Sequence, residues 1–171
     1  MSPVETSEHV VPDSLWDFSI RVYAYPGVEG ACVRLQDAWN ADVPVLLFAL
    51  WRGKWGYELS NTDIQEIANT VTVWQSEVIT PIRQLRRRLR DADLLAPKLN
   101  VGMQAVRGEL QKTELGAERR ELEYLETIEV GVNRKPGAAT IRSNLWTYLY
   151  FLDVSKTDQT ASELLVDAAS L

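Results

Sequence analysis

The sequence of 171 residues contains a single cysteine, Cys32, and a single histidine, His9. One cysteine cannot form an internal disulfide or a zinc site built from several cysteines, and one histidine cannot form a multi-histidine metal site. Long apolar runs are also lacking. The longest extends from Val43 to Trp51, well short of the roughly 20 residues that span a bilayer. We therefore expect no disulfide framework, no metal, no cofactor and no membrane span.

The ends of the chain are polar. The first residues, MSPVETSEHVVPD, lack the basic and apolar regions of a secretory signal. Together with the free cysteine, this predicts a cytoplasmic protein. Residues 1–12 and 154–171 are predicted to be flexible tails that flank a single domain over 13–153.

Helical spacing of apolar residues dominates the chain, and the alternation typical of strands is scarce. Apolar side chains recur every three or four residues in four segments, 14–24, 28–39, 103–129 and 138–152. The run VLLFALW is apolar on every side and follows Asp42, a good helix cap. The sequence predicts an all-α fold, a single compact domain of five or six helices around a buried central helix at about 43–52.

The most regular apolar periodicity begins after Ser60. One apolar face continues from Ile64 to Leu89 in spite of Pro81. Because proline lacks an N–H group and its ring crowds the preceding turn, it bends a helix. The sequence therefore predicts one long helix at about 61–93, kinked near 77–80.

Two stretches, LWDFSIRVYAYPGVEGACVRLQDAWNADVPVLLFALW and WQSEVITPIRQLRRRLR, lie within about residues 14–90. Together they resemble a family of small proteobacterial proteins of unknown function. The parts that carry the resemblance are LWDFS, PGVE, the VLLF core and the W, EV, P and RR positions of the second stretch. The resemblance implies a bacterial, cytoplasmic, all-helical protein, and it implies no activity, substrate or catalytic residue.

Four arginines are spaced i, i+3, i+4 and i+7 on one face of the long helix: Arg83, Arg86, Arg87 and Arg90. Guanidinium groups suit carboxylates and phosphates, and four neighbouring ones repel each other unless anions lie across them. Three sources of anion remain open. They are the glutamates of segment 103–129, an acidic face of a partner protein, and the phosphates of nucleic acid. The net charge of −6 disfavours the last.

Two aromatic residues lie outside the helical stripes. Trp55 and Tyr57 are flanked by Gly53 and Gly56 in an expected loop. Their two open interpretations are packing over the helix at 43–52 and exposure as a recognition edge.

Motifs of catalysis are missing from the sequence. It has no glycine-rich phosphate loop, no G-x-S-x-G elbow and no HExxH pair. No fixed spacing joins any two of the polar candidates into a general acid–base pair, namely Asp17, Arg21, Asp37, Asp42 and Glu77. No catalytic, cofactor-binding or metal-binding residue is assigned.

The sequence thus predicts a non-catalytic helical adaptor or regulatory protein. It would bind an acidic surface of another protein through Arg83, Arg86, Arg87 and Arg90, with Trp55 and Tyr57 as further contacts. One alternative is an RNA-binding accessory protein that uses the same face. The other is a small-molecule enzyme or carrier with a site near the kinked helix. The oligomeric state is left open.

Overall fold

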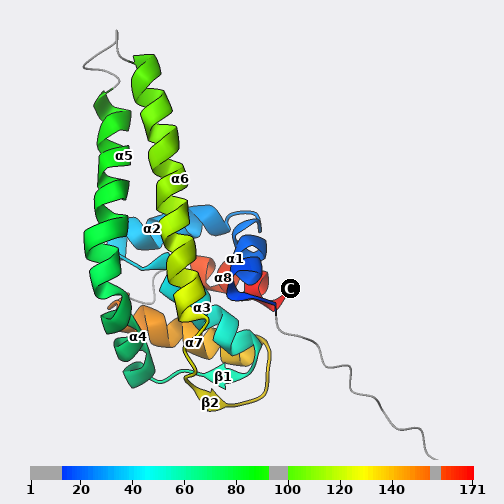
Figure 1. The fold of residues 1–171 in the computed structure, drawn as a ribbon. Coiled ribbons are helices and arrows are strands. Elements are labelled where there is room, and N and C mark those ends of the chain that lie inside the picture. Colours follow the sequence, from blue (N-terminus) through cyan, green and yellow to red (C-terminus); the bar gives the residue numbers. More distant parts are fainter. Residues whose placement is uncertain (1–12, 93–99, 155–158) are drawn as a thin grey trace, which may run out of the picture.

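The computed structural model describes residues 13–92, 100–154 and 159–171 (Figure 1). The described chain is mostly helical. In order, its elements are α1 Leu15–Tyr23, α2 Val28–Trp39, α3 Val43–Lys54, β1 Tyr57–Glu58, α4 Asn61–Trp74, the π-helix η1 Gln75–Ile79, α5 Thr80–Ala92, α6 Asn100–Leu125, β2 Val132–Asn133, α7 Ala138–Phe151 and α8 Gln159–Ser170.

Side-chain caps define the starts of three helices. The Ser14 hydroxyl accepts a 3.0 Å hydrogen bond from the Asp17 amide at the start of α1. The Asp42 carboxylate accepts from the Val45 amide at the start of α3, at 3.3 Å. At α4, Ser60 and Asp63 each accept a hydrogen bond from the other's backbone amide. These bonds satisfy amide groups that a helix leaves unpaired in its first turn.

The core is organised around α3 and α7. Every residue of α3 from Val43 to Gly53 is buried. Helix α7 packs along it, and the buried Asn144 of α7 donates to the carbonyls of Ala49 and Tyr57 at 3.0 and 2.8 Å. Asn144 also accepts from the Leu59 amide at 2.8 Å. A single amide side chain therefore fixes α7 against α3 and against β1, which pairs antiparallel with β2.

The segment expected to be one long kinked helix is divided into α4, η1 and α5. Pro81 has no N–H to donate to the Glu77 carbonyl, so the regular helical ladder is interrupted there. The turn just before it is widened, and the Thr80 amide donates to the Gln75 carbonyl five residues back. This π-helical turn and an additional helix at the C-terminus raise the number of helical elements above the five or six that the sequence predicts.

That additional helix, α8, contradicts the prediction of a flexible tail for residues 159–170, whereas residues 155–158 of the predicted tail lie outside the described residues. Within it, Ala161, Leu165, Val166 and Ala169 are buried in the core. The small alanines and the helical spacing of these residues let α8 pack against α1, α2 and α7. The predicted N-terminal tail, residues 1–12, lies outside the described residues.

Helices α5 and α6 form a feature that we call the arm. They lie side by side and antiparallel, and their far end projects beyond the rest of the molecule (Figure 1). Between Pro81 and Thr113, no described residue of the arm is buried. The arm is therefore held by its near end, where charged side chains meet the body.

One substitution made at two glycines tests the packing of α3 on α7. A Cβ at Gly53 would lie 2.6 Å from the Ile141 Cα, whereas a Cβ at Gly116 in α6 would meet nothing within 4 Å. We expect Gly53→Ala to lower the free energy of unfolding by roughly 1–3 kcal/mol through overpacking. Gly116→Ala should raise it by up to about 1 kcal/mol, because alanine favours the helix. Urea denaturation measures both values, and equal effects would contradict the close approach of α3 and α7.

Candidate functional site

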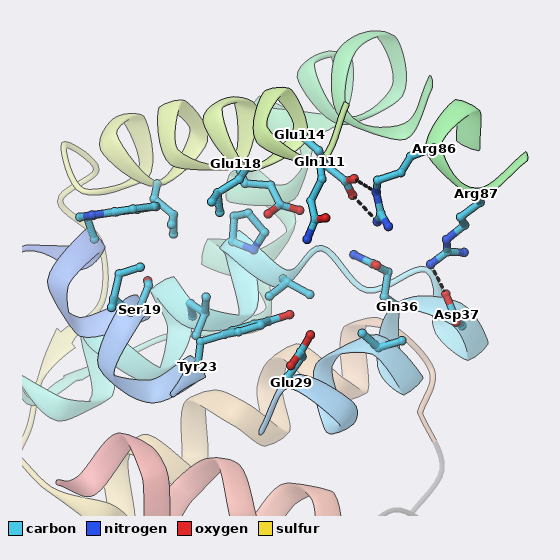
Figure 2. A pocket seen from close by; sticks show the side chains of 18 of the residues that line it. Ser19, Tyr23, Glu29, Gln36, Asp37, Arg86, Arg87, Gln111, Glu114 and Glu118 are labelled. Carbon is cyan, nitrogen blue, oxygen red and sulfur yellow. Dashed lines mark hydrogen bonds and ion pairs between the residues drawn. The ribbon is translucent and has the colours of Figure 1, made fainter. Parts of the chain in front are cut away.

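A cleft of about 450 Å³ lies between the arm and helices α1 and α2 (Figure 2). We call it the arginine cleft. This volume is within the range of about 300–1,000 Å³ that ligand sites occupy. Its walls come from α1, α2, the start of α3, α5 and α6: Trp16, Ser19, Ile20, Tyr23, Glu29, Val33, Gln36, Asp37, Val43, Pro44, Leu47, Arg86, Arg87, Arg90, Gln111, Glu114, Leu115, Glu118 and Leu122.

Behind the arginine cleft, Arg83 joins the arm to the body. Its side chain is only 11% exposed. The guanidinium donates to Glu114 Oε1 at 2.7 Å and to Glu118 Oε1 at 2.8 Å. With the Gln36 amide oxygen turned toward it, Arg83 Nη1 donates a further bond at 2.8 Å. One guanidinium thus connects α5 to both α6 and α2.

The next two arginines are also paired within the molecule. Arg86 Nε donates to Glu114 Oε2 at 2.6 Å, and Arg87 Nη2 donates to Asp37 Oδ1 at 2.5 Å (Figure 2). The Arg87–Asp37 pair is the more open one, with side chains 39% and 50% exposed. The glutamates of α6 therefore pair with Arg83 and Arg86, and α2 contributes Asp37 as the partner of Arg87.

Burial and pairing act in opposite directions on the two glutamates. Burial raises the pKa of Glu114, but hydrogen bonds from Arg86 and Arg83 outweigh burial and hold that pKa below its usual value. Burial also raises the pKa of Glu118, and there the charge of Arg83 does not fully compensate. The positive charge near Glu118 is therefore too small to offset the effect of burial on its pKa.

The structure places the predicted binding residues in two separate regions. Arg86, Arg87 and Arg90 line the arginine cleft, and Arg83 lies behind it. Trp55 and Tyr57 do not line it. They lie near β1, away from the projecting end of the arm (Figure 1). The Arg52 guanidinium covers the Tyr57 ring at 3.9 Å, and Trp55 packs against the core. A binding role for these residues stays a prediction.

The five polar candidates of the sequence are likewise dispersed. Asp17 belongs to the cap of α1, and Arg21 pairs with Asp13. Asp37 pairs with Arg87. Glu77 is exposed and accepts a 3.2 Å hydrogen bond from Ser76. Asp42 alone takes part in an unusual buried arrangement.

That arrangement is a pair of carboxyl groups, Asp42 and Glu121, which we call the acid pair. Glu121 is only 3% exposed, and Gln75 in the π-helical turn donates to its Oε2 at 2.8 Å. Its Oε1 is buried and has no hydrogen-bond partner among the described residues. The carboxyl groups of Asp42 and Glu121 are close enough for each to act on the pKa of the other. A buried carboxyl oxygen that has no donor and faces a second carboxyl group favours the protonated form of Glu121.

Burial is the main cause that raises the pKa of both members of the acid pair, and the negative charge of Asp42 raises that of Glu121 further. The Tyr148 hydroxyl holds the backbone of Asp42, as it donates to the carbonyl at 2.9 Å and accepts from the amide at 2.8 Å. Sequence reasoning treated Asp42 as a helix cap and the glutamates of segment 103–129 as one possible counter-charge for the arginines. The available signal was that Glu114, Ala117 and Glu121 share the helical face of Leu125.

The region that forms these sites has relatives. Residues 14–125 match the model of a family described as a protein of unknown function, DUF2390. The chain belongs to this family. No curated protein and no solved structure matches it significantly. The DUF2390 segment contains every residue that lines the arginine cleft and both members of the acid pair, whereas Tyr148 lies beyond it.

No described helix combines the length and apolar character needed to cross a bilayer. Among the described side chains, no group of three or more histidine, cysteine, aspartate or glutamate residues is arranged to hold a metal ion.

Matched substitutions test how the arm is held. We expect Arg83→Met to lower the free energy of unfolding by about 3–5 kcal/mol, because it leaves Glu118 without the arginine that bonds it and removes one of the two arginines from the buried Glu114. Arg87→Met removes an exposed pair and should cost at most about 1 kcal/mol. Urea unfolding of both variants supplies the comparison. Similar losses in the two variants would refute the anchoring role of Arg83.

The acid pair predicts a dependence of stability on pH. The raised pKa of Glu121 means that the folded chain holds a proton that the unfolded chain releases above the usual carboxyl range. Stability from this proton is complete at low pH and falls as pH rises, by up to about 1.4 kcal/mol per pH unit. Glu121→Gln can keep the hydrogen bond from Gln75 without a titrating proton, so its stability should fall less between pH 5 and pH 8. Glu109→Gln, at an exposed site, is the control and should follow the unsubstituted protein. A parallel curve for Glu121→Gln would refute the raised pKa of Glu121.

Proposed function

We propose that this DUF2390 protein is a non-catalytic helical adaptor that holds a segment of a partner protein in the arginine cleft. The observation that carries the proposal is the meeting of exposed apolar and arginine side chains in one hollow. Ile20, Val33 and Leu115 are 51%, 40% and 53% exposed, come from three different helices, and all line the arginine cleft. Exposed apolar side chains gathered at one site, with polar groups around them, are typical of protein-binding surfaces.

The arginines that line the cleft support the proposal that the partner carries an acidic group. Arg83 is enclosed by its own carboxylates, whereas Arg87 is open to solvent on the side of Asp37. An exposed ion pair contributes only about 0–1 kcal/mol. A carboxylate of the partner can therefore replace Asp37 on Arg87 at little cost, and the planar guanidinium suits such a ligand.

Two other functions have less support. An RNA-binding role for the same face has to overcome the net charge of −6 and the carboxylates already paired with Arg83, Arg86 and Arg87. A small-molecule enzyme or carrier is favoured by one observation, a second cavity of about 440 Å³ beside the π-helical turn, lined in part by Asp42 and Gln75. Buried carboxyl groups with separated pKa values are found in active sites.

Cross-linking with matched sites tests the adaptor proposal. A photoreactive phenylalanine derivative replaces Val33 in the cleft or, as control, Val73, which is 68% exposed on α4 and outside the cleft. The tagged full chain is irradiated in cells of its source, with and without nuclease treatment. We expect a discrete protein adduct from position 33 alone, insensitive to nuclease.

A second pair of variants tests the arginines that line the cleft. Arg87→Glu should reduce the yield of that adduct about tenfold, the equivalent of ~1.4 kcal/mol. Arg88→Glu changes the neighbouring exposed arginine, which does not line the cleft, and should leave the yield unchanged. An RNA adduct at position 33 would favour the nucleic-acid alternative. Equal adducts at positions 33 and 73, or equal effects of the two arginine variants, would contradict the proposal.

A further inference from the structure

One exposed face of α2 forms the floor of the arginine cleft along its length. Glu29, Val33 and Asp37 follow each other at intervals of four residues, all three are exposed, and all three line the cleft. Residues on the same face of a helix eight positions apart are separated by about 12 Å. The floor therefore presents a carboxylate at each end with a valine between them.

The two ends of this floor differ in charge. At one end Arg87 pairs with Asp37, and Arg86 lies beside it on the arm. At the other end, the Glu29 carboxylate has no hydrogen-bond or ion-pair partner among the residues that the structure describes. The arginine cleft is consequently dipolar, with its cations at the Asp37 end.

Tyr23 makes the Glu29 end a small polar recess. Its side chain points from α1 into the cleft, with Glu29 and Glu118 on either side of it in Figure 2. Burial raises the pKa of the Tyr23 hydroxyl, and the carboxylates of Glu118 and Glu29 raise it further. Both carboxylates thus act on the same hydroxyl, from α6 and from α2. Arg83, which bonds Glu118, is shared with Glu114, and Arg86 is itself bonded to Glu114.

We infer that the partner segment carries a basic side chain, which enters this recess between Glu29 and Glu118 while an acidic side chain of the same segment meets Arg87. The inference rests on the proposed function and adds the charge pattern of the partner. The Tyr23 ring supplies a face on which the alkyl stem and the cation can lie. The spacing of the two charges follows from α2. It is about four residues in an extended segment or seven to eight in a helical one.

Charge complementarity singles out a basic group for this end of the cleft. An acidic or phosphorylated side chain would meet two carboxylates and a hydroxyl that they already polarise. An apolar side chain would remove both carboxylates from water without a counter-charge. A lysine or arginine supplies the missing cation, and the negative net charge of the chain attracts such a group from a distance.

A peptide selection tests the inference directly. The full chain is immobilised and used to select from a random dodecapeptide library displayed on phage. Clones that also bind Val33→Trp, a variant with the middle of the cleft filled, are removed. We expect the remaining peptides to be enriched in pairs of one basic and one acidic residue, about four or seven to eight positions apart.

A double-mutant cycle with one selected peptide then assigns the basic contact. Fluorescence anisotropy gives Kd for the peptide and for a version with norleucine at the basic position. Glu29→Gln should raise Kd for the basic peptide about tenfold and leave that for the norleucine peptide unchanged. Glu66→Gln, at an exposed glutamate of α4 outside the cleft, should change neither value. Glu29→Lys should bind best a peptide that carries glutamate at the basic position.

The outcomes separate the two proposals. If no selected peptide depends on the open cleft, the adaptor proposal and this inference both fail. If peptides bind the cleft but lack a basic residue, or if Glu29→Gln weakens the basic and norleucine peptides equally, only the inference fails. Binding that falls with Glu29→Gln but is unaffected by Arg87→Glu would retain the basic contact and refute the acidic one.

Discussion

The ion-pair network of Arg83 is the constraint on which the arrangement of the arm depends. Its planar guanidinium offers donors in fixed directions, and the structure uses them for Glu114, Glu118 and Gln36. These three acceptors belong to two helices that do not otherwise have to share an orientation. A lysine could supply the charge but not the fixed directions. The arginine therefore sets the position of α5 relative to α6 and α2 together.

The same network explains how one face of α6 can hold two buried glutamates and one that is half-buried. Glu114, Glu118 and Glu121 are spaced at helical intervals. The three carboxyl groups differ in how many arginines are bonded to them. Glu114 has two arginines, Glu118 has a share of one, and Glu121 has none bonded to it among the described side chains. Without a cation, a buried carboxyl group retains its proton. The number of arginines bonded to each glutamate thus decreases along α6, and the acid pair lies at the end of this series.

Sequence periodicity was sufficient for much of the helical framework, because helix starts and apolar faces are local properties. Ser14, Asp42 and Ser60 cap helices where their positions indicate. Helix α8 was missed because alanines such as Ala161 and Ala169 give a weak apolar signal, yet they permit close packing. Pro81 explains why the regular helix is interrupted at the π-helical turn. The hydrogen bond from Gln75 in that turn to Glu121 on α6 is a contact between distant segments, which periodicity does not predict.

The candidate site was less accessible to sequence reasoning, because it depends on which charges meet in three dimensions. The sequence shows the spacing of the arginines, and it also shows the glutamates that could neutralise their charge. The sequence did not reveal that Glu121 is buried with no cation bonded to it among the described side chains, or that Glu29 and Asp37 lie at opposite ends of one cleft. Both depend on the register of α5 and α6 against α2, which no local pattern encodes.

That register gives the arginine cleft its polarity. Helix α2 carries a carboxylate at each end of its exposed face, and by itself it would present a symmetric negative surface. Arg87 neutralises only Asp37, because Arg83, four residues earlier in α5, is fixed by Glu114 and Glu118. A shift of α5 by one turn would move the guanidinium by about 5.4 Å along its axis. The buried ion pair in the arm thus determines which end of the exposed cleft remains negative.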